Sequence, residues 1–263
     1  MLISLSQYKE LIQSICIPEL EYYLIPFASP ILYFGNIKDA TVATLGINPS
    51  NKEFLDNNNK LILGELRRFH TLNSLHLSNW EELDNDMYIK IIESFENYFV
   101  KNPYDSWFKQ LDYLLSGAIY SYYFPYNNLV HLDLTPITTN EKWGKIPIQT
   151  QKILLEKGVA ILCELINNSS IKTLVLNGQS VVKSMELLTD SIFLSEYMPS
   201  WNLPRKDKDI RGYSYEFEIR KIANIPLNRT IKILGYNHNI QSSYGVTNAV
   251  KTNIRNWLKE KML

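Results

Sequence analysis

Three polar segments of this sequence carry side chains that could take part in chemistry, and each follows or lies within a short apolar run. Residues 46–50, Gly-Ile-Asn-Pro-Ser, combine a glycine that permits a tight turn, an asparagine whose amide can orient a water molecule, and a proline that stiffens the backbone. Such a loop can hold a small reactant in one geometry. The same residues also suit an ordinary turn between a strand and a helix, because Asn-Pro commonly starts turns.

Residues 235–245, Gly-Tyr-Asn-His-Asn-Ile-Gln-Ser-Ser-Tyr-Gly, form the second segment. Of the 4 histidines, His238 is the one that falls at the end of an expected strand in a polar loop. A neutral imidazole there can donate a hydrogen bond to an oxygen that gains charge in a transition state. A helix cap or a surface histidine is the alternative interpretation.

The third segment is the run Leu-Val-His-Leu-Asp-Leu at 129–134, which places Asp133 where burial is expected. A buried carboxylate is costly unless it is paired or faces a ligand. Asp133 is therefore a candidate ligand-binding residue, and a salt bridge to a nearby Lys or Arg is the alternative.

Short β-branched or apolar runs, each followed by a turn or a polar loop, predict four buried parallel strands, near residues 40–45, 129–134, 171–176 and 231–234. Helical patterns lie between them: one begins after Asp105, another covers 153–166, and a last one follows Thr247. This alternation predicts an α/β fold, a three-layer α/β/α sandwich around a central four-stranded parallel sheet. The carboxyl ends of such strands meet at one edge, which would bring the three polar segments together.

Two regions fit this scheme less well. Residues 51–128 read as a mostly helical insertion, and the alternation of Tyr213, Tyr215, Phe217 and Ile219 predicts a strand of a small hairpin at the sheet edge. The chain shows no repeat of 20 to 50 residues and no flexible linker. We therefore expect one domain over residues 1–263.

Composition excludes several classes of protein. The 263 residues are 45% hydrophobic with 27 basic and 27 acidic side chains, which argues against disorder and against bulk electrostatic coating of nucleic acid, although a local basic patch remains compatible. No uncharged apolar run reaches the length of a membrane span. Cys16 and Cys163 are too few for a four-cysteine zinc or iron–sulfur site, so we expect neither metal nor cofactor. The N-terminus lacks a basic and then apolar leader, which favours the cytoplasm.

Residues 46–50 resemble the first motif of the uracil-DNA glycosylase superfamily, whose thymine- and mismatch-specific branches carry Gly-Ile-Asn-Pro-Gly. Residues 235–245 lie where that family has its His-Pro-Ser or Asn-Pro-Ser motif, and Asp133 lies near the position of its base-reading asparagine. Ser50 replaces the last glycine of the first motif, the second motif lacks its proline, and the cysteines of the iron–sulfur branches are missing. The resemblance covers the whole chain as strand order, but only the first motif is specific.

This resemblance implies a uracil-DNA glycosylase-like fold and a DNA glycosylase that hydrolyses the N-glycosidic bond of a flipped pyrimidine nucleotide. It assigns Asn48 to positioning the attacking water and His238 to stabilising charge on the base oxygen. Because an asparagine is not a base at neutral pH, Glu53 or Asp56 is the candidate source of a carboxylate. For both acids the alternative is a favourable position in the first turn of a helix.

The resemblance also places Asp133 against the base. An ionised carboxylate only accepts hydrogen bonds, so it suits the exocyclic amine of cytosine, whereas an asparagine would satisfy uracil. Unmodified cytosine would be a harmful target, and some bacterial relatives excise glucosylated hydroxymethylcytosine from phage DNA in antiviral defence. The alternatives are base-excision repair of uracil or mismatched thymine, and a non-catalytic module that binds a modified base. No Gly-rich phosphate-binding motif or Gly-x-Ser-x-Gly elbow supports another enzyme class.

The expected partner is double-stranded DNA that contains a modified or damaged base, bound by a monomer without a membrane. Ile47 and Phe69 are expected beside Asp133 in the base pocket. Phosphate and backbone contacts are expected from Arg67, Arg68, Asn239, Ser242, Ser243 and Tyr244. For the two arginines, a helix with one exposed basic face is the alternative.

Overall fold

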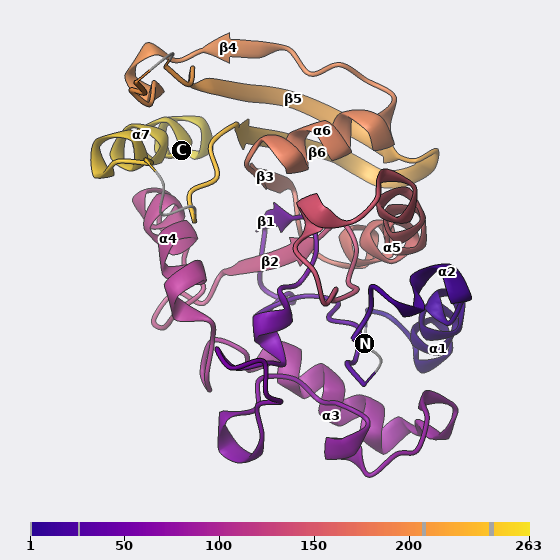
Figure 1. Cartoon of the computed structure of the whole chain (residues 1–263). Coiled ribbons are helices and arrows are strands. Elements are labelled where there is room, and N and C mark those ends of the chain that lie inside the picture. The colour runs from indigo at the N-terminus through magenta and orange to yellow at the C-terminus, as the bar shows by residue number, and fades with distance from the viewer. Residues whose placement is uncertain (1, 26, 207–208, 242–244) are drawn as a thin grey trace.

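The computed structural model describes residues 2–25, 27–206, 209–241 and 245–263, and a mixed β-sheet with strand order β2-β1-β3-β6-β5-β4 forms its centre (Figure 1). The strands are β1 (Val42–Gly46), β2 (Leu129–Asp133), β3 (Thr173–Asn177), β4 (Ser195–Tyr197), β5 (Tyr213–Ile222) and β6 (Ile225–Tyr236). The four strands expected from the sequence pair in parallel, as β2-β1-β3-β6. The α/β class is thus confirmed.

The sheet is larger than the four parallel strands that the sequence predicted, so that part of the prediction is wrong. β5 pairs with β6 in the antiparallel direction, and β4 pairs with β5 in the same manner, so the described sheet has six strands. The alternation from Tyr213 to Ile219 did predict β5. The short strand β4 is exposed at every residue, which removes the hydrophobic pattern that would have revealed it.

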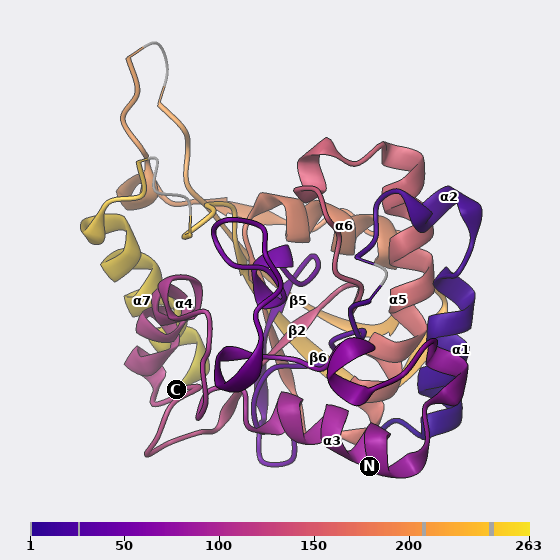
Figure 2. The same cartoon turned by 60° about the horizontal axis from the view of Figure 1, so that its bottom comes forward.

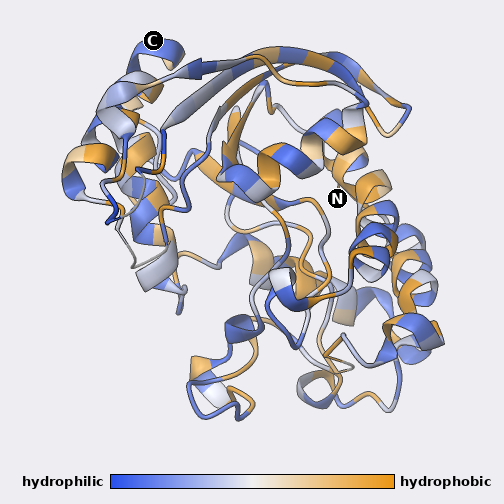
Figure 3. Ribbon diagram, turned by 45° about the horizontal axis from the view of Figure 1, so that its top comes forward, coloured by the Kyte–Doolittle hydropathy of each residue, from blue (hydrophilic) through white to orange (hydrophobic). Residues whose placement is uncertain are grey.

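Helices cover both sides of the sheet, with α4 and α7 on one side and α5 and α6 on the other (Figures 1 and 2). The α-helices are α1 (Leu5–Ile15), α2 (Pro18–Glu21), α3 (Asn85–Glu96), α4 (Asp105–Leu115), α5 (Ile148–Asn168), α6 (Gln179–Thr189) and α7 (Asn248–Met262). In Figure 3 hydrophobic and hydrophilic stretches alternate along these helices, as expected of amphipathic helices that cover a sheet. The helix predicted after Thr247 is α7, and the Thr247 side chain caps it by accepting from the backbone N–H of Val250.

The insertion at 51–128 is less regular than predicted. Besides α3 and α4 it contains short 3₁₀ turns, η1 (Asn51–Glu53), η2 (Gly64–Leu66), η3 (Asn73–Leu75), η4 (Trp80–Glu82) and η5 (Ser116–Ala118). Two further 3₁₀ turns elsewhere are η6 (Trp143–Lys145) and η7 (Pro199–Trp201). The insertion is held together by stacked aromatic rings, among them Tyr98 against Phe69 and Phe99 against Tyr122.

One continuous cluster of buried apolar side chains reaches from Ile3 near the start of the chain to Leu258 in α7. Every residue of β1 and β2 is buried, as required of central strands covered on both faces. Within the described ranges, no helix combines the length and the apolar character that crossing a bilayer requires.

Candidate active site

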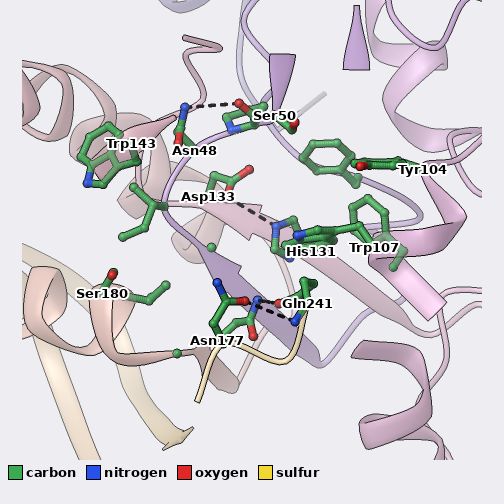
Figure 4. Close-up of a pocket in the computed structure, with 18 of the residues that line it drawn as sticks. Asn48, Ser50, Tyr104, Trp107, His131, Asp133, Trp143, Asn177, Ser180 and Gln241 are labelled. Atoms are coloured by element: carbon green, nitrogen blue, oxygen red, sulfur yellow. Dashed lines mark hydrogen bonds and ion pairs between the residues drawn. The ribbon is translucent and has the colours of Figure 1, made fainter. Parts of the chain in front are cut away.

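A cavity of about 390 Å³ opens at the carboxyl ends of the parallel strands (Figure 4). It lies where the strand order reverses between β1 and β3, the usual ligand position in an open α/β sheet. Its volume is within the range of small-molecule sites. Loops after β1, β2, β3 and β6 and the start of α4 contribute its lining residues, which include Ile47, Asn48, Ser50, Glu53, Tyr104, Trp107, His131, Asp133, Trp143, Asn177, Ser180, Asn237, Asn239 and Gln241.

Gly46 lets the ends of β1 and β2 approach closely. It pairs with Asp133 in the strand register, and a Cβ atom at this position would lie 2.3 Å from Oδ1 of Asp133 and 3.0 Å from Nε2 of His131. The glycine of the first motif therefore makes room for the carboxylate on the neighbouring strand.

Asn48 is fixed by its amide group. Its Nδ2 donates to Oγ1 of Thr139 at 3.0 Å and to the carbonyl of Pro49 at 3.2 Å. With both amide hydrogens engaged, Oδ1 is the free end of the side chain, and no hydrogen bond joins it to another described residue. An acceptor held in this manner at a cavity wall can bind a water molecule in a defined orientation.

Glu53 also lines the cavity and is 3% exposed. Its Oε2 accepts a hydrogen bond from the hydroxyl of Tyr98 at 2.8 Å and lies 3.9 Å from Nε of Arg68. Burial raises the pKa of the Glu53 carboxyl to about 7, against the opposing effects of Arg68 and Tyr98, and the charge of Asp133 adds to the increase. The carboxyl can therefore exchange a proton near neutral pH.

Asp56, the other candidate carboxylate from the sequence, stabilises a local turn. Its Oδ1 accepts from the backbone N–H groups of Asn58 and Lys60, both at 2.8 Å, and so closes a turn. Asp56 does not belong to the cavity lining. Of the two candidates, the structure places Glu53 at the site.

Asp133 ends a buried chain of polar groups. Its Oδ1 lies 3.4 Å from Nε2 of His131, whose Nδ1 is 2.7 Å from Oγ1 of Thr44, and Thr44 in turn shares a short hydrogen bond with the hydroxyl of Tyr122. Burial raises the pKa of Tyr122 far above its usual value, so the phenol keeps its proton. If Tyr122 donates to Thr44, then Thr44 donates to Nδ1, and the hydrogen of the neutral imidazole is on Nε2, the nitrogen that lies 3.4 Å from Asp133.

These polar groups, and not a Lys or Arg, are the partners of Asp133, for which the sequence had left a salt bridge open as the alternative. The strand register explains it, because Thr44 and Gly46 on β1 lie beside His131 and Asp133 on β2. Alternate residues of a strand face the same side, so the two pairs share one face of the sheet. His131 was visible in the sequence two residues before Asp133, and that spacing was the signal that could have found it.

Aromatic rings form the walls of the cavity. Tyr104 and Trp107 lie on one side and Trp143 on the opposite side (Figure 4). The Trp107 ring meets the His131 ring edge-on at a centroid distance of 5.0 Å. Trp107 lies in the helix predicted after Asp105, and no sequence pattern marked Tyr104, Trp107 or Trp143 as site residues. A space with aromatic walls and polar groups at its floor suits a flat heterocycle.

His238 does not face the cavity, which corrects the role expected for it. The side chain is 3% exposed, and its Nε2 lies 2.7 Å from the carbonyl oxygen of Trp201. Burial lowers the pKa of the imidazole, so a neutral ring donates to that carbonyl. Its neighbours Asn237, Asn239 and Gln241 line the cavity instead. The sequence identified the right loop and the wrong residue in it.

Phe69 and Arg68 also differ from their expected roles. Phe69 has no exposed surface, and its ring stacks on Tyr98 at 5.1 Å, so it belongs to the core and not to the base pocket. Arg68 donates to the carbonyl oxygens of Asn102 and Lys52 and supports Glu53, so it is engaged inside the protein and not offered to a phosphate.

The remaining DNA-contact predictions are placed as follows. Arg67 is partly exposed at the end of η2, and Asn239 lines the cavity. Ser242, Ser243 and Tyr244 lie outside the described residues. Ile240 of the same loop is 1% exposed and packs in the core.

Within the part of the chain that the structure describes, no group of three or more His, Cys, Asp or Glu side chains is arranged to hold a metal ion. No model of a known protein family matches the chain, and no curated protein sequence matches it either. Fold and cavity together define an α/β protein with a polar, aromatic-walled pocket at the switch point of its sheet.

Proposed function

We propose that this protein is a DNA glycosylase that hydrolyses the N-glycosidic bond of a flipped pyrimidine nucleotide, with a modified cytosine as the candidate base. The observation that carries the proposal is the convergence of Asn48, Glu53 and Asp133 on one aromatic-walled cavity. A base must leave the helical stack to enter such a space. The first motif, Gly-Ile-Asn-Pro, adds the resemblance to the uracil-DNA glycosylase superfamily.

In the proposed reaction, Oδ1 of Asn48 accepts a hydrogen bond from a water molecule and aims its oxygen at C1′ of the deoxyribose. Glu53, with a pKa near 7, takes the proton of that water as the new C1′–O bond forms. The C1′–N bond breaks, and its electron pair leaves with the base. Glu53 supplies the proton acceptor that an asparagine lacks.

The base is recognised by the floor and the walls of the cavity. Nε2 of His131 lies 3.4 Å from Oδ1 of Asp133, and the other carboxylate oxygen, Oδ2, can accept from the exocyclic amine of cytosine. Trp107 and Trp143 can stack against the ring. A cavity of about 390 Å³ leaves room beside a pyrimidine for a substituent at its 5-position, which supports a glucosylated hydroxymethylcytosine of phage DNA and a role in antiviral defence.

The experiment incubates the protein with duplexes that carry uracil, mismatched thymine, hydroxymethylcytosine or glucosylated hydroxymethylcytosine, and then measures alkali-labile cleavage. We expect abasic sites with a modified cytosine and, for Asn48→Ala, a loss of about a hundredfold or more in rate. Asn58→Ala is the matched control, since Asn58 is exposed. Release of uracil alone would indicate a repair glycosylase. Binding without base release would indicate a non-catalytic module.

A further inference from the structure

The chain between η7 and β5, residues 202–212, forms an arm whose charge differs from that of the whole protein. In Figure 2 its described parts, residues 202–206 and 209–212, extend away from the body of the molecule. Residues 202–212 contain four basic and two acidic side chains, a net charge of +2, in a protein whose overall net charge is zero. Positive charge is thus concentrated on one projecting segment.

Two basic side chains of the arm are available to a partner. Lys206 and Arg211 are exposed, and no hydrogen bond or ion pair joins either cationic group to another described residue. The guanidinium of Arg211 lies over the ring of Tyr197, 5.7 Å from the ring centroid, and this contact orients it. Arg205 is engaged locally, because its side chain donates to the carbonyl of Pro204 at 3.2 Å. Lys206 and Arg211 are therefore the charges that the described part of the arm offers.

Backbone hydrogen bonds hold the two sides of the arm together. The N–H of Leu203 donates to the carbonyl of Ile210 at 2.9 Å, and the N–H of Ile210 donates back to the carbonyl of Leu203 at 3.0 Å. Closer to the sheet, the N–H of Gly212 donates to Oδ1 of Asn202 at 3.1 Å. A segment that is already ordered loses little conformational entropy when it binds. The arm is therefore suited to rigid presentation of its charges.

The arm leaves the sheet at the edge where the cavity opens. β5 runs antiparallel to β6, so Ser214 near the start of β5 pairs with Tyr236 at the end of β6. The end of β6 belongs to the carboxyl edge of the parallel strands, and the loop after it supplies Asn237, Asn239 and Gln241 to the cavity lining. Since the arm directly precedes β5, it begins beside the cavity.

The loop after β6 also anchors the base of the arm. Nδ2 of Asn237 donates to the carbonyl of Arg211 at 2.8 Å, and Oδ1 of Asn237 accepts from the N–H of Tyr213 at 2.8 Å. On the other side of the arm, Nε2 of His238 donates to the carbonyl of Trp201 at 2.7 Å. Two neighbouring residues of the cavity loop thus fix both ends of the arm relative to the cavity.

We propose that the arm is a DNA-binding element, in which Lys206 and Arg211 contact phosphate groups of the duplex beside the nucleotide held in the cavity. That the partner is DNA rests on the proposed glycosylase function. The phosphates next to a flipped nucleotide lie at the mouth of the pocket that holds its base, which is where the arm begins. Cations at this place neutralise phosphates and release their counterions. Asn237 and His238 are positioning residues, because they act through the arm.

The test compares the removal of two charges from the arm with the removal of two charges from the opposite edge of the sheet. Fluorescence anisotropy measures duplex affinity between 50 and 200 mM salt. We expect the double variant Lys206→Ala with Arg211→Ala to bind roughly 10- to 100-fold more weakly at 100 mM salt, and its slope of log affinity against log salt to fall by about two units. The matched control is Lys172→Ala with Arg220→Ala, at exposed residues beside the amino ends of β3 and β6, and it should bind like the wild type.

The charge-preserving variant Lys206→Arg with Arg211→Lys should keep the wild-type slope, because phosphate neutralisation depends on charge. Duplexes with and without a modified base should lose affinity equally, since phosphate contacts carry no sequence information. Thermal melting of each variant verifies that the fold is retained.

An unchanged slope in the arm variant, or an equal change in the arm variant and the control, would overturn the proposal. Failure of the wild-type protein to bind any duplex at 50 mM salt would overturn it as well. Single-turnover base release at saturating protein tests the glycosylase function separately. Duplex binding that depends on the arm without base release would leave the arm standing and remove the glycosylase function, and base release with an unchanged slope would do the reverse.

Discussion

Glu53 is a buried residue whose burial changes its acid–base properties. Its neighbours Tyr98 and Arg68 favour the ionised form, yet burial outweighs them and raises the pKa to about 7. A carboxyl with this pKa is half ionised at neutral pH, which is the condition under which a general base both accepts and releases a proton efficiently.

The pH dependence follows from this value. If Glu53 takes the proton of the attacking water, it must be ionised, so base release should rise with pH and reach half its plateau near pH 7. Glu53→Gln should lower the plateau at least about a hundredfold and remove this dependence. Rate profiles between pH 5.5 and 8.5 measure both effects, with the exposed Glu156→Gln as the matched control. A wild-type profile that is flat over this interval would exclude Glu53 as the base.

Substitution of Asp133 tests which base the proposed glycosylase recognises. Asp133→Asn can still accept from the cytosine amine, but it loses the charge-assisted bond and adds an NH₂ donor that faces another donor. About 1 to 3 kcal/mol are at stake, so release of a cytosine derivative should fall roughly 5- to 150-fold while any uracil release holds or rises. Competition assays with both substrates measure the ratio. Equal losses on both would show that Asp133 serves the structure alone.

At the level of elements, the register between β1 and β2 builds the floor of the site. The register places Thr44 beside His131 and Gly46 beside Asp133, so two strands far apart in sequence supply one buried polar chain. No side chain except hydrogen fits at position 46 without moving the carboxylate of Asp133.

Gly46→Ala should therefore affect both the fold and the choice of base. The added methyl group would overpack the strand ends, with a cost of about 1 to 3 kcal/mol in the free energy of unfolding, and displace Asp133. Urea denaturation measures the first effect, and the ratio of cytosine to uracil release measures the second. Gly144→Ala is the control for stability, because a Cβ atom there meets nothing within 4 Å. Unchanged stability and selectivity in Gly46→Ala would show that the strand ends can separate without consequence.

Sequence patterns predicted the elements of the centre better than those of the periphery. β1, β2 and β3 are short buried runs between polar loops, and such runs are recognisable without tertiary context. β6 begins at Ile225, well before the predicted start, because its first half pairs only with β5 and alternates in exposure. The structure of the insertion at 51–128 was harder to predict. Stacked aromatic rings stabilise irregular loops there, and such loops leave no regular helical pattern in the sequence.

At the scale of the whole molecule, 27 basic and 27 acidic residues give no net attraction for DNA. For the proposed DNA binding, this balance favours few phosphate contacts and therefore a weak dependence of duplex affinity on salt. We expect a loss of about ten- to a hundredfold between 50 and 200 mM salt, less than the 10³ or more typical of proteins with 6 to 10 phosphate contacts.

Arg67 offers a way to test this expectation by mutation. Arg67→Ala should reduce the slope of log affinity against log salt by about one unit, equally for all sequences. Arg220→Ala is the control, since Arg220 is exposed on β5 near the end of β6 that lies away from the cavity. Fluorescence anisotropy at several salt concentrations measures both slopes. An effect of equal size in the two variants would place the DNA elsewhere on the surface.

The sequence by itself determined the α/β class, the parallel direction of the four central strands and the loops that meet at their carboxyl ends. These features depend on local hydrophobic patterns and on the rule that parallel strands share one edge. It also pointed to Asn48 and Asp133, because a polar residue in a rigid turn or a buried run is conspicuous along the chain, and both line the cavity. Glu53 came from the family resemblance, which left it open against Asp56.

Tertiary structure alone decided which neighbours in a loop face the cavity. His238 points to the Trp201 carbonyl and Gln241 points to Asn177, although both belong to one segment. Their directions depend on partners from other parts of the fold, which the order of residues in the loop does not specify. For the same reason the hydrogen bonds that link Tyr122 through Thr44 to His131 are visible only where β1 and β2 lie side by side, since a hydrogen bond depends on distance and angle in space.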